Sequence, residues 1–128
     1  NKKERALWDK AGVDLPAKAE WYLETGQGMI STIRVAAERE GYTLTDRGTY
    51  IKYAHTHGGD PDLKVLVEGD PVLFNQYSAI AINPDRCGSV KYDLAKQFIS
   101  WITSEDIQEF IGNYKLLGKQ LFTPNAGN

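Results

Sequence analysis

The sequence is poor in the residues that build disulfides and metal centres. Among its 128 residues, Cys87 is the only cysteine, and His55 and His57 are the only histidines. A lone cysteine cannot form a disulfide within the chain, and it excludes a zinc site built from paired cysteines. The two histidines precede a Gly-Gly pair, where we expect exposed loop side chains in preference to metal ligands. We therefore expect no metal site.

Long hydrophobic runs and clusters of one charge are also missing. No apolar stretch approaches the roughly 20 residues that a membrane-spanning helix needs. Fifteen Lys and Arg against seventeen Asp and Glu give a formal charge of −2, with both signs scattered along the chain. Nucleic-acid binding requires a clustered basic face, so no nucleic-acid partner is expected. A hydrophobic content of 41% is typical of a globular chain.

The chain does contain helix-like and strand-like segments in alternation. Apolar spacing predicts helices at residues 1–11, 28–40 and 92–102, a short helix starting at Thr45 or Asp46, and a last helix capped by Thr103 or Ser104. Aromatic and β-branched runs predict strands at residues 20–23, 42–44, 64–67 and 77–82. A proline-containing connector is expected at residues 13–19. This order of elements predicts an α/β fold.

The first candidate binding element is the glycine-rich turn at residues 26–29 (GQGM), which opens into a helix. Helix N-termini present unpaired N–H groups and partial positive charge, so they bind anions readily. The backbone around Gln27, Gly28 and Met29 therefore predicts a possible oxyanion site. An ordinary strand-to-helix turn fits the same residues. A Walker A loop is excluded, because no Gly-Lys-Ser/Thr follows.

The second candidate is the segment at residues 45–50 (TDRGTY), at another strand-to-helix transition. Arg47 offers a planar fork of donors that suits a tetrahedral oxyanion, and Thr45 adds a hydroxyl. Asp46 could hold that fork or cap the helix. The residues fit a capped helix with a surface arginine at least as well, and spacing alone favours that simpler interpretation.

Catalysis has little support in the sequence. No Gly-x-Ser-x-Gly elbow occurs, and no histidine is placed to activate a nucleophile. The carboxylates of Glu38, Glu40, Glu68 and Asp70 are expected on solvated faces and turns. We therefore expect a binding protein and not an enzyme, although turnover by an anion-utilising enzyme of related fold stays an alternative.

Several segments together resemble the tungstate-binding proteins of ABC importers. The most specific is residues 42–50 (YTLTDRGTY), and residues 20–29 (EWYLETGQGM) match the middle of that family. The resemblance continues in order through the following segments: residues 66–70 (LVEGD), 73–77 (LFNQY), 98–104 (FISWITS) and 118–122 (GKQLF), then Pro124. It covers nearly the whole chain in a colinear way.

The resemblance implies a two-lobed, type II periplasmic-binding-protein-like α/β fold, of which this chain is the carboxy-terminal part. Family members are about twice as long, so Asn1 is not expected to be the natural start. Residues 1–74 would belong mainly to the second lobe. Residues 75–128 would supply a crossover strand and terminal helices that pack on the first lobe.

The function implied is extracytoplasmic capture of tungstate, or molybdate, for import by an ABC transporter, a role that needs no cofactor. The residues implied to bind the oxyanion are Arg47, Thr45, Gln27, Gly28 and Met29. Implied partners are the transporter's permease and either the missing amino-terminal half or a second copy of the chain, and the implied location is the periplasm. An oxyanion-sensing regulatory domain is the alternative function.

Overall fold

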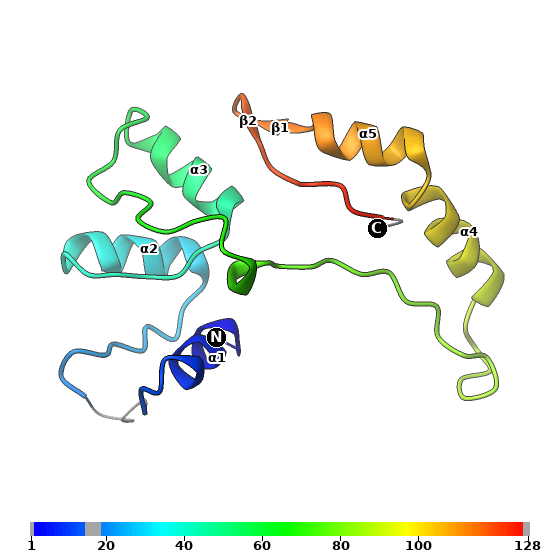
Figure 1. Cartoon of the computed structure of the whole chain (residues 1–128), viewed down its shortest axis with the longest axis horizontal. Coiled ribbons are helices and arrows are strands. Elements are labelled where there is room, and N and C mark those ends of the chain that lie inside the picture. Colours follow the sequence, from blue (N-terminus) through cyan, green and yellow to red (C-terminus); the bar gives the residue numbers. More distant parts are fainter. Residues whose placement is uncertain (1, 15–18, 127–128) are drawn as a thin grey trace. The chain divides into compact units, whose positions relative to one another are not determined.

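A computed structural model describes residues 2–14 and 19–126 of the chain. Its internal contacts divide it into two compact units, Asn1–Asn75 and Gln76–Asn128. Figure 1 shows the elements in chain order. The first unit holds α1 (Lys2–Lys10), α2 (Met29–Glu38), α3 (Arg47–Thr56) and the 3-10 turn η1 (Pro71–Leu73). The second holds α4 (Tyr92–Ile102), α5 (Glu105–Asn113), β1 (Lys115–Leu116) and β2 (Lys119–Gln120). The predicted connector at 13–19 lies partly outside the described residues.

The three α-helices of the first unit end in one hydrogen-bonding motif. In each, an N–H beyond the helix donates to the carbonyl five residues earlier, and a left-handed residue precedes it, as in a Schellman motif. The donor and acceptor pairs are Val13 and Trp8 at 3.0 Å, Gly41 and Ala36 at 2.8 Å, and Gly59 and Ala54 at 2.8 Å. At the end of α1 the left-handed residue is Gly12, with φ 68°. At the end of α2 the left-handed residue is Glu40, with φ 50°, and Gly41 follows it.

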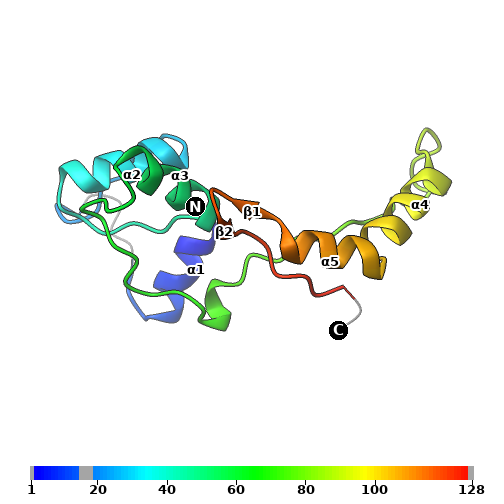
Figure 2. The ribbon, with the colours of Figure 1, turned by 90° about the horizontal axis from the view of Figure 1, so that it is seen from above.

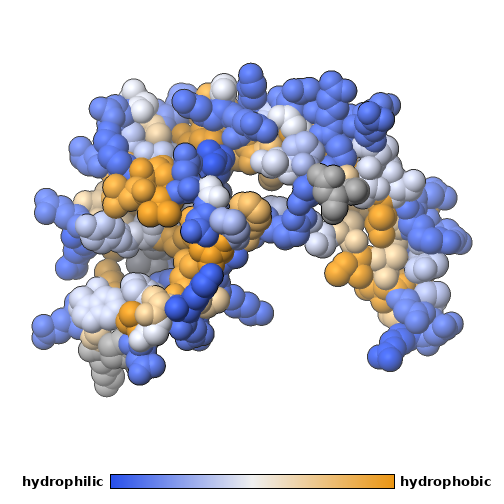
Figure 3. Space-filling model, viewed as in Figure 1, coloured by the Kyte–Doolittle hydropathy of each residue, from blue (hydrophilic) through white to orange (hydrophobic). Residues whose placement is uncertain are grey.

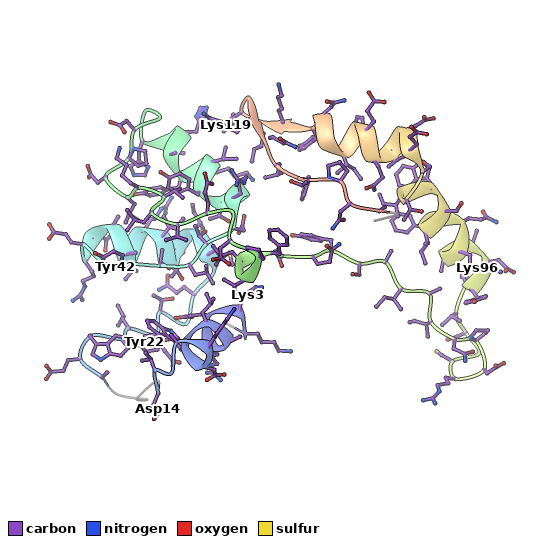
Figure 4. The ribbon with its side chains drawn as sticks, in the orientation of Figure 1. Lys3, Asp14, Tyr22, Tyr42, Lys96 and Lys119 are labelled. Atoms are coloured by element: carbon purple, nitrogen blue, oxygen red, sulfur yellow. The ribbon has the colours of Figure 1, made fainter. Side chains whose placement is uncertain are left out.

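The core of the first unit lies where α2 contacts α3. Ile33 and Ala36 of α2 and Tyr53 of α3 are buried there, with Ile33 only 1% exposed. α2 has ten residues and is therefore about 15 Å long. Residues 41–46, which include the exposed Tyr42 labelled in Figure 4, run back along α2. As a result, α2 and α3 begin at the same end of the helix pair (Figures 1 and 2).

Side-chain hydrogen bonds attach α1 to the rest of the first unit. The Lys3 ammonium donates to the carbonyls of Val72, at 3.0 Å, and Phe74, at 2.8 Å, at the η1 turn. The Tyr22 hydroxyl donates to a Glu4 carboxylate oxygen at 3.0 Å. Figure 4 labels Lys3 near η1 and Tyr22 beside α1. α1 is therefore held by polar contacts on both sides, although it buries none of its own residues.

The second unit contains the predicted helix at residues 92–102 with the predicted bounds. Ser104 occupies the N-cap position of α5, but its hydroxyl donates to the Trp101 carbonyl at 2.8 Å and makes no capping bond. The hairpin of β1 and β2 was not predicted. Leu117 and Gly118 form its two-residue turn, with φ 51° and 78°, and Lys115 pairs with Gln120. Leucine is an unusual residue for a left-handed turn position, which hid this hairpin in the sequence.

The four strands predicted at residues 20–23, 42–44, 64–67 and 77–82 are not formed in the described chain, where β1 and β2 are the strands present. These segments lack a neighbouring strand to accept their backbone hydrogen bonds. Their large apolar side chains consequently stay at the surface, part of which is orange in Figure 3. Examples are Leu66, 71% exposed, and Ile80, 83% exposed. The prediction of strands was therefore wrong for these four segments in this structure.

Candidate functional site

The start of α2 is an uncapped helix N-terminus on a glycine-rich turn. Gly26 has φ 61°, a conformation that favours glycine, and Gly28 is the N-cap residue with no side chain to accept a hydrogen bond. The first N–H groups of α2 therefore lack the side-chain acceptor that usually satisfies them. Gln27, Gly28 and Met29 are all exposed. This end of the helix can accept an anionic group.

Two threonines hold that turn in place. The hydroxyl oxygens of Thr25 and Thr32 lie 2.9 Å apart, and the Thr32 hydroxyl donates to the Gly28 carbonyl at 3.2 Å. The Gln27 N–H points to the Thr25 hydroxyl at 3.4 Å, a long contact. These bonds lie around the turn without occupying the N–H groups of the first helical residues. Neither threonine was among the predicted site residues, because neither belongs to the glycine motif.

The start of α3, by contrast, is capped. Asp46 is its N-cap residue and accepts two hydrogen bonds from Thr49, one from the backbone N–H at 2.8 Å and one from the hydroxyl at 2.6 Å. Partial burial pushes the pKa of the Asp46 carboxyl upward, but the bonds from Thr49 outweigh it and hold that pKa below its ordinary value. The capping role proposed for Asp46 is thus present. Thr45 is half-buried, and its hydroxyl makes a 3.4 Å contact with the Asp46 carbonyl.

Arg47 is the first residue of α3, and its side chain is 56% exposed. Its Nη2 group donates a hydrogen bond to Oε2 of Glu68 at 3.1 Å. Sequence reasoning assigned Glu68 to a solvated surface and missed this pairing. The two residues are 21 positions apart, and no local pattern in the sequence connects them.

The predicted residues lie at or just before the starts of two neighbouring helices. Gln27, Gly28 and Met29 belong to the start of α2, whereas Thr45 and Arg47 belong to the start of α3. Both starts lie at the same end of the helix pair (Figures 1 and 2). Within the described residues, no hydrogen bond joins one turn to the other. The first unit therefore offers N–H groups and a guanidinium at one end, without a closed binding site.

The histidines lie away from this end. His57 is the residue after α3, and its Nδ1 atom lies 2.8 Å from the Tyr53 carbonyl, with its ring 4.2 Å from the Tyr53 ring. In the described part of the chain, no group of three or more His, Cys, Asp or Glu side chains is placed to hold a metal ion. Among residues 2–14 and 19–126, none of the helices has the length and apolar character that crossing a bilayer requires.

Comparisons of sequence and of structure find the same kind of relative for this chain. The model of the PBP superfamily domain matches residues 1–106. The tungstate-binding protein TupA of Campylobacter jejuni is 48% identical over 124 residues, and that of Peptoclostridium acidaminophilum is 41% identical over 128 residues. The chain also resembles the solved structure of the tungstate-binding protein TupA from Desulfovibrio alaskensis G20, with 57% identity, a TM-score of 0.87 and 98% of this chain covered.

These relatives are longer than the chain. It spans 46% and 43% of the two curated relatives, and 50% of the solved chain, while 97% and 98% of its own length is matched. The resemblance to tungstate-binding proteins is thereby confirmed, and so is the periplasmic-binding-protein-like fold. Because the family model covers most of the sequence and a solved relative shares its fold, the chain belongs to the PBP superfamily.

Proposed function

We propose that the protein containing this chain is an extracytoplasmic solute-binding protein that captures tungstate, or molybdate, for an ABC importer. The observation that carries the proposal is colinear identity of 57% over nearly the whole chain to a solved tungstate-binding protein. A third relative supports the transport role. It is named a putative ABC transporter anion-binding protein, comes from Haloferax volcanii, and is 40% identical over 129 residues, although this chain covers only 36% of it.

The chemistry of the first unit supports an oxyanion as ligand. We propose that the N–H groups at Gln27, Gly28 and Met29, together with Arg47 and Thr45, form this chain's share of the site. Uncapped N–H groups carry the positive end of the α2 dipole, and the guanidinium adds a full positive charge at the same end of the helix pair. A dianion can bind there by hydrogen bonds alone. On this proposal the protein is a carrier that does no covalent chemistry on its ligand.

Calorimetric titration of the complete protein that contains this sequence tests the proposal. Tungstate and molybdate should bind more tightly than sulfate and phosphate. Arg47→Ala should weaken tungstate binding by about 10-fold to 100-fold, because charge-assisted hydrogen bonds to an oxyanion are lost. Arg34→Ala is the matched control, since Arg34 is also exposed but lies within α2. Unchanged tungstate affinity in Arg47→Ala would remove that residue from the site.

We further propose that the amino-terminal half of the family's two-lobed fold covers the second unit. None of the described residues of this unit is buried, and many of its large apolar side chains are exposed. Ile80, Ile82, Leu94 and Phe98 contribute to an open groove of about 460 Å³ between α4 and the preceding segment. On this proposal residues 1–74 belong mainly to the second lobe, and residues 75–128 pack on the first.

The remaining partner is the permease of the importer, to which a closed and loaded binding protein delivers its ligand. Location outside the cytoplasm follows from that role. Co-purification of the complete protein with its transporter, in the presence and absence of tungstate, tests the partnership. Equal recovery of the protein from membranes with and without the transporter, whether or not tungstate is present, would count against the partnership.

A further inference from the structure

The Arg47–Glu68 ion pair holds the charged side chain of the proposed ligand-binding set in the first unit. Both side chains are more than half exposed, at 56% and 62%. An ion pair this open to water adds little to folding stability, because solvent screens it. The more important consequence of the pair is therefore the position in which it holds the guanidinium.

Glu68 is itself placed by the contacts on either side of it. Before it in the chain, the Tyr50 hydroxyl of α3 donates to the Leu63 carbonyl at 3.0 Å. After it, Gly69 turns the chain with φ 78°, and Asp70 accepts from the Val72 N–H at 2.8 Å at the start of η1. The carboxylate therefore sits on a segment attached to α3 on one side and to η1 on the other.

The segment runs along α3 in the opposite direction. Arg47 of the first turn meets residue 68, whereas Tyr50 of the next turn meets residue 63. This order brings Glu68 to the start of α3, the end at which α2 also begins (Figure 1). A carboxylate thus stands beside the proposed anion site, where it would repel a dianion unless its contact with Arg47 compensated.

The contact uses one of the three guanidinium nitrogens. Nη2 faces Glu68, and the described residues supply no other acceptor for the Arg47 side chain. A guanidinium has five N–H donors in a rigid plane, so the remaining nitrogens can still bind an oxyanion as a fork. A carboxylate that fixes one edge of the plane reduces the rotamers that ligand binding must freeze.

We propose that Glu68 is a positioning residue for oxyanion binding, holding Arg47 so that the free edge of its guanidinium meets the ligand. This inference rests on the proposed function. It predicts a loss of affinity when Glu68 is removed. A carboxylate that merely competed with the ligand for Arg47 would give the opposite sign, since its removal would strengthen binding.

The test is calorimetric titration of the complete protein with sodium tungstate. Glu68→Ala should weaken tungstate binding about 3-fold to 10-fold. The loss should be modest because the Arg47–Glu68 pair is exposed to solvent, unlike the buried residues that orient metal ligands in other proteins. Glu68→Gln should stay within about threefold of the wild type, since its amide oxygen still accepts from the guanidinium. In the Arg47→Ala background, Glu68→Ala should cause no further loss.

Glu38→Ala serves as the control, because it removes one exposed carboxylate at the other end of α2. It should leave affinity unchanged, and thermal midpoints of the ligand-free variants should match the wild type. The inference would be overturned if Glu68→Ala bound tungstate as tightly as the wild type or more tightly. It would also be overturned if Glu68→Ala weakened binding equally in the wild-type and Arg47→Ala backgrounds. A wild type that binds no oxyanion would instead overturn the proposed function, and the inference with it.

Discussion

Asp46 accepts both the backbone N–H and the hydroxyl of Thr49, at 2.8 and 2.6 Å, and thereby fixes the first turn of α3. Arg47 follows Asp46 directly and is the first residue of that helix. The direction in which its side chain leaves the backbone is therefore set by the cap. The two helix starts differ in this respect, because Gly28 leaves α2 uncapped while Asp46 closes α3.

Removing this cap should destabilise the complete protein. We expect Asp46→Ala to lower the free energy of unfolding by about 1 kcal/mol, since the two donors of Thr49 lose their acceptor. Urea unfolding followed by circular dichroism measures this. Ser104→Ala is the matched comparison, because Ser104 holds the N-cap position of α5 without a capping bond. A loss at Ser104 equal to that at Asp46 would argue against capping as the cause.

The same cap should make stability depend on pH. Burial raises the pKa of Asp46 and the hydrogen bonds from Thr49 lower it, with a net value below the ordinary one. A carboxyl whose pKa is lower in the folded state contributes its full stability above its unfolded pKa of about 3.9. That contribution is lost as the pH falls through the folded pKa.

The variant Asp46→Asn isolates this effect, because asparagine also caps helices but does not titrate in this range. The stability difference between wild type and variant should be constant near neutral pH and shrink below about pH 4. Urea midpoints measured from pH 7 to pH 3 give the curve. A difference that does not change with pH would mean that the Asp46 carboxyl has the same pKa in the folded and unfolded protein.

The helices could be predicted from the sequence because their signals are local. Apolar spacing predicted the helix at residues 92–102 with the bounds observed, and Asp46 was one of two residues predicted as the cap of α3. Strands could not be settled in this way, since a strand exists only with a partner to receive its hydrogen bonds. Residues 77–82 carry the composition of a buried strand, yet in the described chain they pair with nothing.

The candidate site residues stand out in the sequence, and their role in binding stays a prediction, whereas the contacts around them were missed. Residues 26–29 and 45–47 are visible because a glycine turn or an arginine beside a cap is a local pattern. Glu68 is not, because the 21 residues between it and Arg47 return along α3 by contacts that no short motif encodes. Its assignment to a solvated surface was correct about exposure and incomplete about its partner.

Two glycines at the α2 turn should respond differently to the same change. Gly26→Ala should cost about 1–2 kcal/mol of stability, because Gly26 has φ 61° and alanine is strained there. At Gly28 φ is −69° and an added Cβ would meet no atom within 4 Å, so Gly28→Ala should cost only about 0.5 kcal/mol. Urea unfolding without ligand measures both.

Tungstate titration of these variants completes the comparison. If the N–H groups at Gly28 and Met29 contact the anion, the methyl group added by Gly28→Ala should hinder its approach. Tungstate affinity should then fall although stability changes little. Gly88→Ala is the control, because that glycine lies in the other unit and also has open space around it. Full affinity in Gly28→Ala would place the anion away from this turn.

The 128-residue chain alone should behave as an incomplete fold. In the described residues, the buried hydrophobic side chains are Ile33, Ala36 and Tyr53, and none of them lies in the second unit. The chain should therefore bind a hydrophobic dye, associate in analytical ultracentrifugation and melt without a sharp transition. The complete protein should do none of these. A monomeric chain that melts cooperatively would contradict the proposed packing of the second unit on a missing half.

A single substitution should act differently in the 128-residue chain alone and in the complete protein. Phe98, 52% exposed on α4, should be covered in the complete protein and open in the chain alone. Phe98→Asn should then reduce dye binding by the chain and lower the thermal midpoint of the complete protein. Lys96→Asn is the control on the same helix, because Lys96 pairs at the surface with Asp93 (Figure 4). If both variants left the complete protein equally stable, the α4 groove would be a free surface, and its apolar lining would need another partner.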